Sequence, residues 1–242
     1  MNRIINYELI RARSLKSTWI FPLIGVGLAW SLAYFGTSND GISSVTDGFG
    51  PSYFSLPDII NNSYSPLSIF FITIPFAQAF GHEYRDGTMR LTLSAYPSRI
   101  KVFTAKLLVP SAIALISGLI AMIGIRIIYQ RRVPLGNTEL GNLTSLRHLG
   151  FTVMWGLIVA AVVIFTRNMA AGIAGVVVWA AILEQIVVAF TVSKWHAVDQ
   201  YLPLSQGMLW TQQGERKSLI VILVATTLFA LLSGTKFLKS DA

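Results

Sequence analysis

The sequence contains no cysteine among its 242 residues, and charged residues make up only 12% of it. Without thiols, disulfide bonds, thiol catalysis and cysteine-ligated metal sites are excluded. The charged fraction is half of the roughly 25% found in soluble domains. With 53% hydrophobic residues and a mean hydropathy of +0.60, the composition indicates a chain that lies mostly in lipid.

Motifs of several functional classes are also missing. No G-x-x-x-x-G-K-[ST] phosphate loop is present, so the chain is not expected to hydrolyse ATP itself. No H-E-x-x-H occurs, and the three histidines, His82, His148 and His196, are far apart. No metal site is therefore expected.

Long apolar runs are what the sequence has in abundance. A spanning helix needs about 20 mostly apolar residues, and six stretches approach or exceed this length. They predict an all-α integral membrane protein in which residues 1–242 form a single transmembrane domain. The predicted spans are about 18–36, 66–82, 102–128, 146–166, 170–192 and 218–238.

The distribution of Lys and Arg predicts the orientation. With the N-terminus inside, 12 of the 19 basic residues fall in inner segments and 7 on the outer side. The positive-inside rule then favours both termini in the cytoplasm, although the outer pair Arg131 and Arg132 argues mildly against it. The net charge of +8 is explained by basic cytoplasmic loops, and no nucleic-acid partner is expected.

Two segments outside the spans are amphiphilic. Residues 1–17 are expected to be retained in the mature chain and either form a helix on the inner membrane surface or act as a basic flank of the first span. Glu8 interrupts their apolar arc. Residues 193–217 predict short interfacial or re-entrant helices on the outer side, with Pro203 breaking any continuous helix.

The connection formed by residues 83–101 is the most highly charged part of the chain. Gly87 permits a sharp turn after the second span, and Asp86 or Thr88 can cap a short helix. Pro97 ends that helix, because the residue before a proline leaves the helical region. The positive-inside rule alone explains the basic residues here, but not the two acids that flank Arg85.

The stretch "GHEYRDGTMRLTLSAYPSRIKVFTAKLL" resembles the connection after the second span in permeases of the ABC type-2 exporter family. Members commonly have Glu, a basic residue, Gly-Thr, leucines, then Pro-Ser/Thr-Arg and a Lys entering the third span. The predicted surface helix, the six spans and the amphiphilic segment before the last span also match. The matching positions here are Glu83, Arg85, Gly87, Thr88, Leu91, Leu93, Pro97, Ser98, Arg99 and Lys106.

This resemblance implies a dimeric permease, paired with itself or a related permease in a prokaryotic plasma membrane. It would export a hydrophobic or amphiphilic substrate such as a drug, a peptide or a lipid. Two copies of a separate ATP-binding subunit would hold ATP and Mg²⁺, and this chain would bind no cofactor and would not itself be an enzyme. The residues implied in coupling to that subunit are Glu8, Glu83, Arg85, Asp86, Gly87, Thr88, Arg90, Pro97, Ser98 and Arg99.

Polar residues inside the spans are candidates for a substrate pathway. A carboxylate among apolar residues is costly in a membrane and is a functional-site hypothesis. Glu184 is expected to line the pathway, to pair across the dimer, or to meet water or Arg126 at the outer surface. Gln78 and Gln185 are the other pathway candidates.

Small residues at four-residue spacing allow close approach of helices in a membrane. Gly25 with Ala29, and Ala171 with Gly175, would suit a dimer face built by the first and fifth spans.

Two other functional classes are open. An intramembrane enzyme, such as a protease or a lipid-modifying enzyme, needs acids, bases or metal ligands clustered at one depth. A stand-alone ion-coupled carrier predicts internal repeats. Glu184 has no second carboxylate or histidine at similar depth, and the two halves of the chain show no convincing repeat.

Overall fold

The computed structural model describes residues 2–37, 55–133, 141–184, 186 and 201–239. Within these ranges it is all-α, with ten α-helices and one π-helix, η1. The helices are α1 (Asn2–Ser14), α2 (Lys16–Gly36), α4 (Leu56–Ser63), α5 (Pro66–Asp86), α6 (Met89–Ala95), α7 (Arg99–Arg132), α8 (Gly141–Thr166), α9 (Met169–Val178), η1 (Trp179–Leu183), α11 (Pro203–Gln213) and α12 (Arg216–Lys239).

Four helices, α2, α7, α8 and α12, are long and apolar enough to cross a membrane. The prediction of an all-α multi-pass membrane protein is therefore supported, but two of the six predicted spans are not among these four. Helix α5 has 21 residues but ends in the polar sequence His82 to Asp86. Helix α9 has only 10 residues before it passes into η1, and residues 187–192 of the fifth predicted span lie outside the described part.

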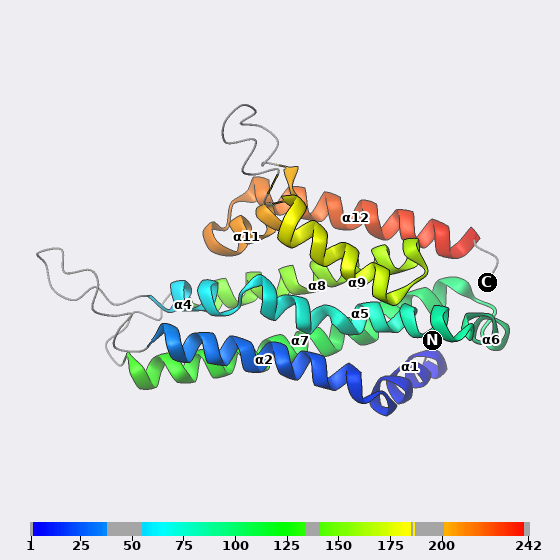
Figure 1. Ribbon diagram of the computed structural model, residues 1–242, viewed down its shortest axis with the longest axis horizontal. Coiled ribbons are helices and arrows are strands. Elements are labelled where there is room, and N and C mark those ends of the chain that lie inside the picture. Colours follow the sequence, from blue (N-terminus) through cyan, green and yellow to red (C-terminus); the bar gives the residue numbers. More distant parts are fainter. Residues whose placement is uncertain (1, 38–54, 134–140, 185, 187–200, 240–242) are drawn as a thin grey trace, which may run out of the picture.

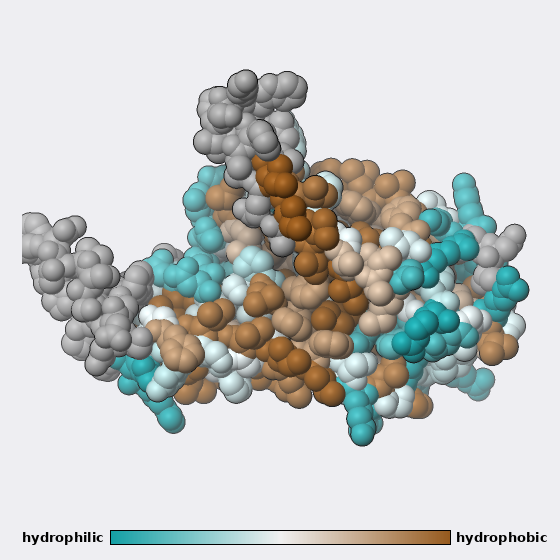
Figure 2. Space-filling model, in the orientation of Figure 1, coloured by the Kyte–Doolittle hydropathy of each residue, from teal (hydrophilic) through white to brown (hydrophobic). Residues whose placement is uncertain are grey.

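The long helices run side by side along the molecule (Figure 1). Helix α1, helix α6 and the C-terminal end of α12 lie at one end, whereas α4 and α11 lie toward the other. Apolar residues cover the middle of the face in Figure 2, and hydrophilic residues gather toward its ends. This distribution is the one expected for a bundle with lipid around its middle and water at both ends.

Helix α5 is central and packs against α2, α7, α8 and α9. Its contact with α2 is close because Gly25 has no side chain: a Cβ atom there would lie 2.7 Å from the carbonyl oxygen of Ser68. Ala29 is fully buried in the same bundle. The predicted dimer role of Gly25 and Ala29 is therefore wrong, since this pair packs inside the chain. Ala171 and Gly175 are exposed, and their role in a dimer stays a prediction.

The N-terminal segment forms a helix, α1, which packs on α7. Its place at a membrane surface stays a prediction. Its buried stripe differs from the predicted apolar arc. Ile4, Glu8 and Ala12 face the bundle, while Leu9 is 42% exposed. The inward stripe thus contains an acid because α7 supplies a basic partner for it, as described below.

Two helices occur in the predicted outer gaps. Helix α4 was not predicted. Its N-cap residue is Ser55, whose N–H donates to Asp58 Oδ2 at 3.0 Å. Helix α11 is one of the short helices predicted within residues 193–217. Pro203 is the first residue of this helix, a position that suits proline because the first turn needs no N–H partner. No described helix continues through Pro203, as predicted. Residues 193–200 lie outside the described part.

Candidate functional site at the α6 end of the bundle

The connection from α5 to α7 has the predicted order of turn, short helix, break and helix. Gly87 adopts a left-handed conformation, with φ of 66°, and its N–H donates to the carbonyl oxygen of Glu83. Thr88 and Ser98 occupy the N-cap positions of α6 and α7, but neither side chain makes a capping hydrogen bond in the described structure. The predicted positions are confirmed, and the predicted capping bonds are not.

One side of this connection is exposed, and we call it the inner-end surface after the orientation predicted from the sequence. Its central side chain, Leu91, is 68% exposed. The opposite side of α6 is anchored: Met89 is buried, and Leu93 packs against the core. Leu91, but not Leu93, is thus available to a partner. The inner-end surface consists of Arg85, Asp86, Gly87, Arg90, Leu91, Pro97 and Ile100.

Two arginines of this connection make intramolecular hydrogen bonds. Arg85 Nε donates to Asp86 Oδ1 at 2.9 Å, and both side chains are exposed. This hydrogen bond holds the pKa of the Asp86 carboxyl below its ordinary value. Arg99 is half-buried and donates to the carbonyl oxygen of Leu238 at 2.8 Å, which ties the start of α7 to the end of α12.

Beneath this surface lies a buried ion-pair cluster, made of Glu8, Arg11, Glu83 and Lys106. Lys106 Nζ lies 2.7 Å from Glu8 Oε1 and 2.5 Å from Glu83 Oε1. Arg11 Nη1 lies 2.8 Å from Glu83 Oε1 and 3.2 Å from Glu8 Oε2. The cluster joins helices α1, α5 and α7, and its two acids and two bases balance in charge.

Two residues assigned to coupling on sequence grounds, Glu8 and Glu83, belong to this cluster. They are 4% and 3% exposed, so their carboxylates do not face a partner in this structure. They fix the position of α1 against α5 and α7 instead. Any role of theirs in coupling would act through the helices that they join.

Sequence reasoning did not assign Arg11 and Lys106 to the site. Lys106 lies in the third predicted span, where a lysine must find a partner because an isolated charge is costly in lipid. Glu8 interrupts the apolar arc of α1 in the same way. These two charges in apolar surroundings were the sequence signal: each needs a partner of opposite charge, and pairing them would have predicted the cluster.

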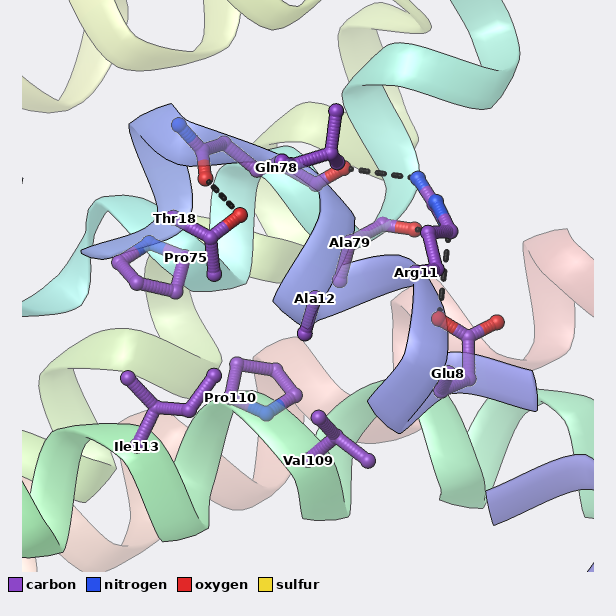
Figure 3. Close-up of a pocket in the computed structure, with 11 residues that line it drawn as sticks. Glu8, Arg11, Ala12, Thr18, Pro75, Gln78, Ala79, Val109, Pro110 and Ile113 are labelled. Atoms are coloured by element: carbon purple, nitrogen blue, oxygen red, sulfur yellow. Dashed lines mark hydrogen bonds and ion pairs between the residues drawn. The ribbon is translucent and has the colours of Figure 1, made fainter. Parts of the chain in front are cut away.

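Gln78 lies on α5 next to the cluster and lines a small pocket (Figure 3). Its Oε1 accepts a hydrogen bond from Thr18 Oγ1 at 3.0 Å, and its backbone carbonyl accepts one from Arg11. Its Nε2 is buried without a hydrogen-bond partner among the described residues. The pocket has a volume of about 20 Å³, which is enough for one water molecule. A place in a substrate pathway stays a prediction.

Glu184 is fully buried, and its carboxylate caps the N-terminus of helix α11, which lies about 20 residues later in the sequence. Its Oε1 accepts from the N–H of Leu204 at 3.0 Å and from Trp179 Nε1 at 2.8 Å. Its Oε2 accepts from the N–H and the hydroxyl of Ser205 at 3.0 and 3.1 Å. A carboxylate is favourable there because the first N–H groups of a helix lack intrahelical partners.

The alternative partner of Glu184, Arg126, is engaged elsewhere: its Nη1 donates to Asn142 Oδ1 at 2.6 Å. The other predicted pathway residue, Gln185, lies outside the described residues.

Among the described residues, no three His, Asp or Glu side chains are placed to hold a metal ion. No protein-family model matches the chain, and no curated protein matches it. Its four long apolar helices support a multi-pass membrane protein.

Proposed function

We propose that this chain is the transmembrane permease subunit of an ABC transporter and that the inner-end surface docks a separate ATP-binding subunit. One observation carries the proposal. A short helix with an exposed leucine and flanking charges lies at one end of a lipid-facing bundle, directly above a buried cluster that ties three helices together. Two copies of the chain and two ATP-binding subunits would make up the transporter.

The packing of α6 suits the transmission of force. Met89 and Leu93 hold the helix against the bundle, and the ring of Tyr96 at its end lies 6.1 Å from that of Tyr7 on α1. A displacement of α6 therefore moves α1 as well as α5 and α7. The ion-pair cluster then makes these helices move together, because separating one of them would leave a charge buried without its partner.

The interior suits a hydrophobic or amphiphilic substrate. A cavity of about 250 Å³ lies between α8, α9, η1, α11 and α12. Its wall includes Trp155, Trp179, Pro203 and Phe229, together with aliphatic side chains. Apolar cavities of this kind bind apolar parts of small molecules.

Site-specific cross-linking from Leu91 tests the docking role. A photoreactive amino acid is placed at Leu91 in cell membranes, and the adduct is identified by mass spectrometry. Leu23, which is exposed on α2, serves as the matched control because it faces lipid in the proposed arrangement.

We expect the Leu91 probe to capture a protein that carries a phosphate loop, and the Leu23 probe to capture none. Capture of no such protein from Leu91, or equal capture from both positions, would contradict the proposed docking.

A further inference from the structure

A hollow separate from the buried ion-pair cluster lies where the C-terminal end of α5 meets the turn between α8 and α9. Its volume is about 790 Å³. Its polar wall comprises the side chains of Tyr84, Arg85, Arg167 and Asn168, and its apolar wall comprises residues of α9 that include Ile173 and Ala174. The hollow therefore offers cationic groups on one side and aliphatic surface on the other.

The cationic side has unused hydrogen-bond donors. Arg167 is exposed and makes no side-chain hydrogen bond or ion pair within the described structure. Arg85 gives its Nε to Asp86, which leaves both of its Nη groups available. Guanidinium groups bind phosphate oxygens with paired, charge-assisted hydrogen bonds. The nearby start of α9 adds a favourable dipole for an anion.

The backbone of Arg167 has a strained conformation. Its φ of 52° is a left-handed conformation, and Arg167 is the one non-glycine residue with positive φ in the described chain. Glycine would adopt this turn with less strain. A strained residue in a turn next to a hollow points to a role for its side chain.

The apolar side continues along α9 toward the middle of the bundle. Val177 and Val178 are exposed on that helix, as is Ile182 on η1. A molecule whose anionic group meets the two arginines can therefore lay an alkyl chain along α9. A small inorganic anion has no alkyl chain that could contact this apolar surface.

We propose that this hollow binds the phosphate-bearing headgroup of an anionic membrane phospholipid, with Arg167 and Arg85 on the phosphate and an acyl chain along α9. Basic pockets between membrane helices on the cytoplasmic side hold such headgroups in other proteins. This inference does not depend on the proposed transport function, because it concerns the binding of lipid by the chain alone.

Native mass spectrometry of the purified, delipidated chain tests the site. The chain is titrated with phosphatidylglycerol and with phosphatidylcholine that carry identical acyl chains, so that the lipids differ in headgroup alone. Arg167→Gly removes the guanidinium and suits the positive φ. Arg13→Ala is the matched control, because it removes an exposed inner-end charge on α1, away from the hollow.

We expect preferential binding of phosphatidylglycerol, reduced about five-fold by Arg167→Gly, which corresponds to about 1 kcal/mol per basic residue at a membrane surface. Arg13→Ala should bind as the unaltered chain does, and Arg167→Lys should fall between. If Arg167→Gly does not fold, Arg167→Lys and Arg85→Gln carry the test.

Equal lipid preference in Arg167→Gly and the unaltered chain would overturn the proposal, and so would an equal loss in Arg13→Ala. Inorganic phosphate separates the two sources of the anion. If inorganic phosphate displaces phosphatidylglycerol at equimolar concentration, the acyl chain contributes nothing, the hollow is a simple anion site and the lipid assignment is wrong.

Discussion

Lys106 carries a positive charge with none of its surface exposed, and two carboxylates meet it. Removing one partner of a buried ion pair leaves the other partner's charge uncompensated, which typically costs 3–5 kcal/mol. Glu8 and Glu83 therefore depend on this lysine, although Arg11 still contacts both of them.

Lys106→Met should lower the free energy of unfolding by about 3 kcal/mol, since two buried acids would share Arg11 alone. Unfolding of the purified protein in detergent micelles measures this change. Lys101→Met is the matched control, because Lys101 is exposed on the same helix. Adding Glu83→Gln to Lys106→Met should restore part of the loss. A Lys106→Met protein as stable as Lys101→Met would contradict the structural role of the cluster.

Glu184→Ala should loosen the start of α11. The N–H groups of Leu204 and Ser205 would lose their acceptor, and a lost N-cap costs about 0.5–2 kcal/mol. Hydrogen exchange followed by mass spectrometry should show faster exchange at the start of α11, with the long helix α8 unchanged. Glu215→Ala removes an exposed acid and should leave α11 as it is. Unaltered exchange in Glu184→Ala would contradict the capping role.

The sequence was informative about individual charges but not about their partners. Glu184 was recognised as an acid that needs a reason to lie among apolar residues, yet two of its partners are backbone N–H groups at the start of a helix about 20 residues away. Backbone donors carry no sequence signal. Glu8 and Lys106 lie 98 residues apart, so their pairing depends on helix packing that composition does not specify.

At the scale of helices, the contact between α2 and α5 is limited by one glycine. A Cβ on Gly25 would lie within 2.8 Å of Ile72 Cγ1 and closer still to the backbone of Ser68. A backbone atom cannot turn aside as a flexible side chain can. The two helices would have to separate to admit even a methyl group.

Gly25→Ala should therefore destabilise the protein by about 1–3 kcal/mol, as overpacking does. Gly27→Ala is its control on the same helix: a Cβ there meets nothing within 4 Å. That change should be neutral or stabilise by up to about 1 kcal/mol, because alanine favours helix more than glycine does. The same unfolding measurement compares them, and equal stability of the two variants would contradict the close packing of α2 on α5.

Helices were predicted best where apolar runs are long and uninterrupted, as in α7 and α8. Helix α4 was missed because its eight residues, which include Asp58 and Asn61, read as part of a polar outer gap. The structure explains it through tertiary contacts, since His148 Nε2 lies 2.9 Å from Asn61 Oδ1. The π-helix η1 after α9 could not be predicted either, because the spacing of apolar residues does not distinguish it from an α-helix.

At the scale of the whole molecule, both ends of the described chain lie at the same end of the bundle as α6 (Figure 1). This arrangement agrees with an even number of membrane crossings, and the positive-inside rule assigns that end to the cytoplasm. The proposed docking of an ATP-binding subunit requires this assignment, because ATP is held on the cytoplasmic side.

The orientation of α6 can be measured directly, because the chain has no cysteine of its own and a single introduced thiol can be labelled without background. Leu91→Cys probes the inner-end surface, and Tyr201→Cys, which is 70% exposed before α11, probes the opposite end. A membrane-impermeant maleimide is applied to right-side-out and to inverted membrane vesicles. We expect Leu91→Cys to react in inverted vesicles alone and Tyr201→Cys in right-side-out vesicles alone. Reaction of Leu91→Cys in right-side-out vesicles would contradict the central claim that the inner-end surface faces the cytoplasm.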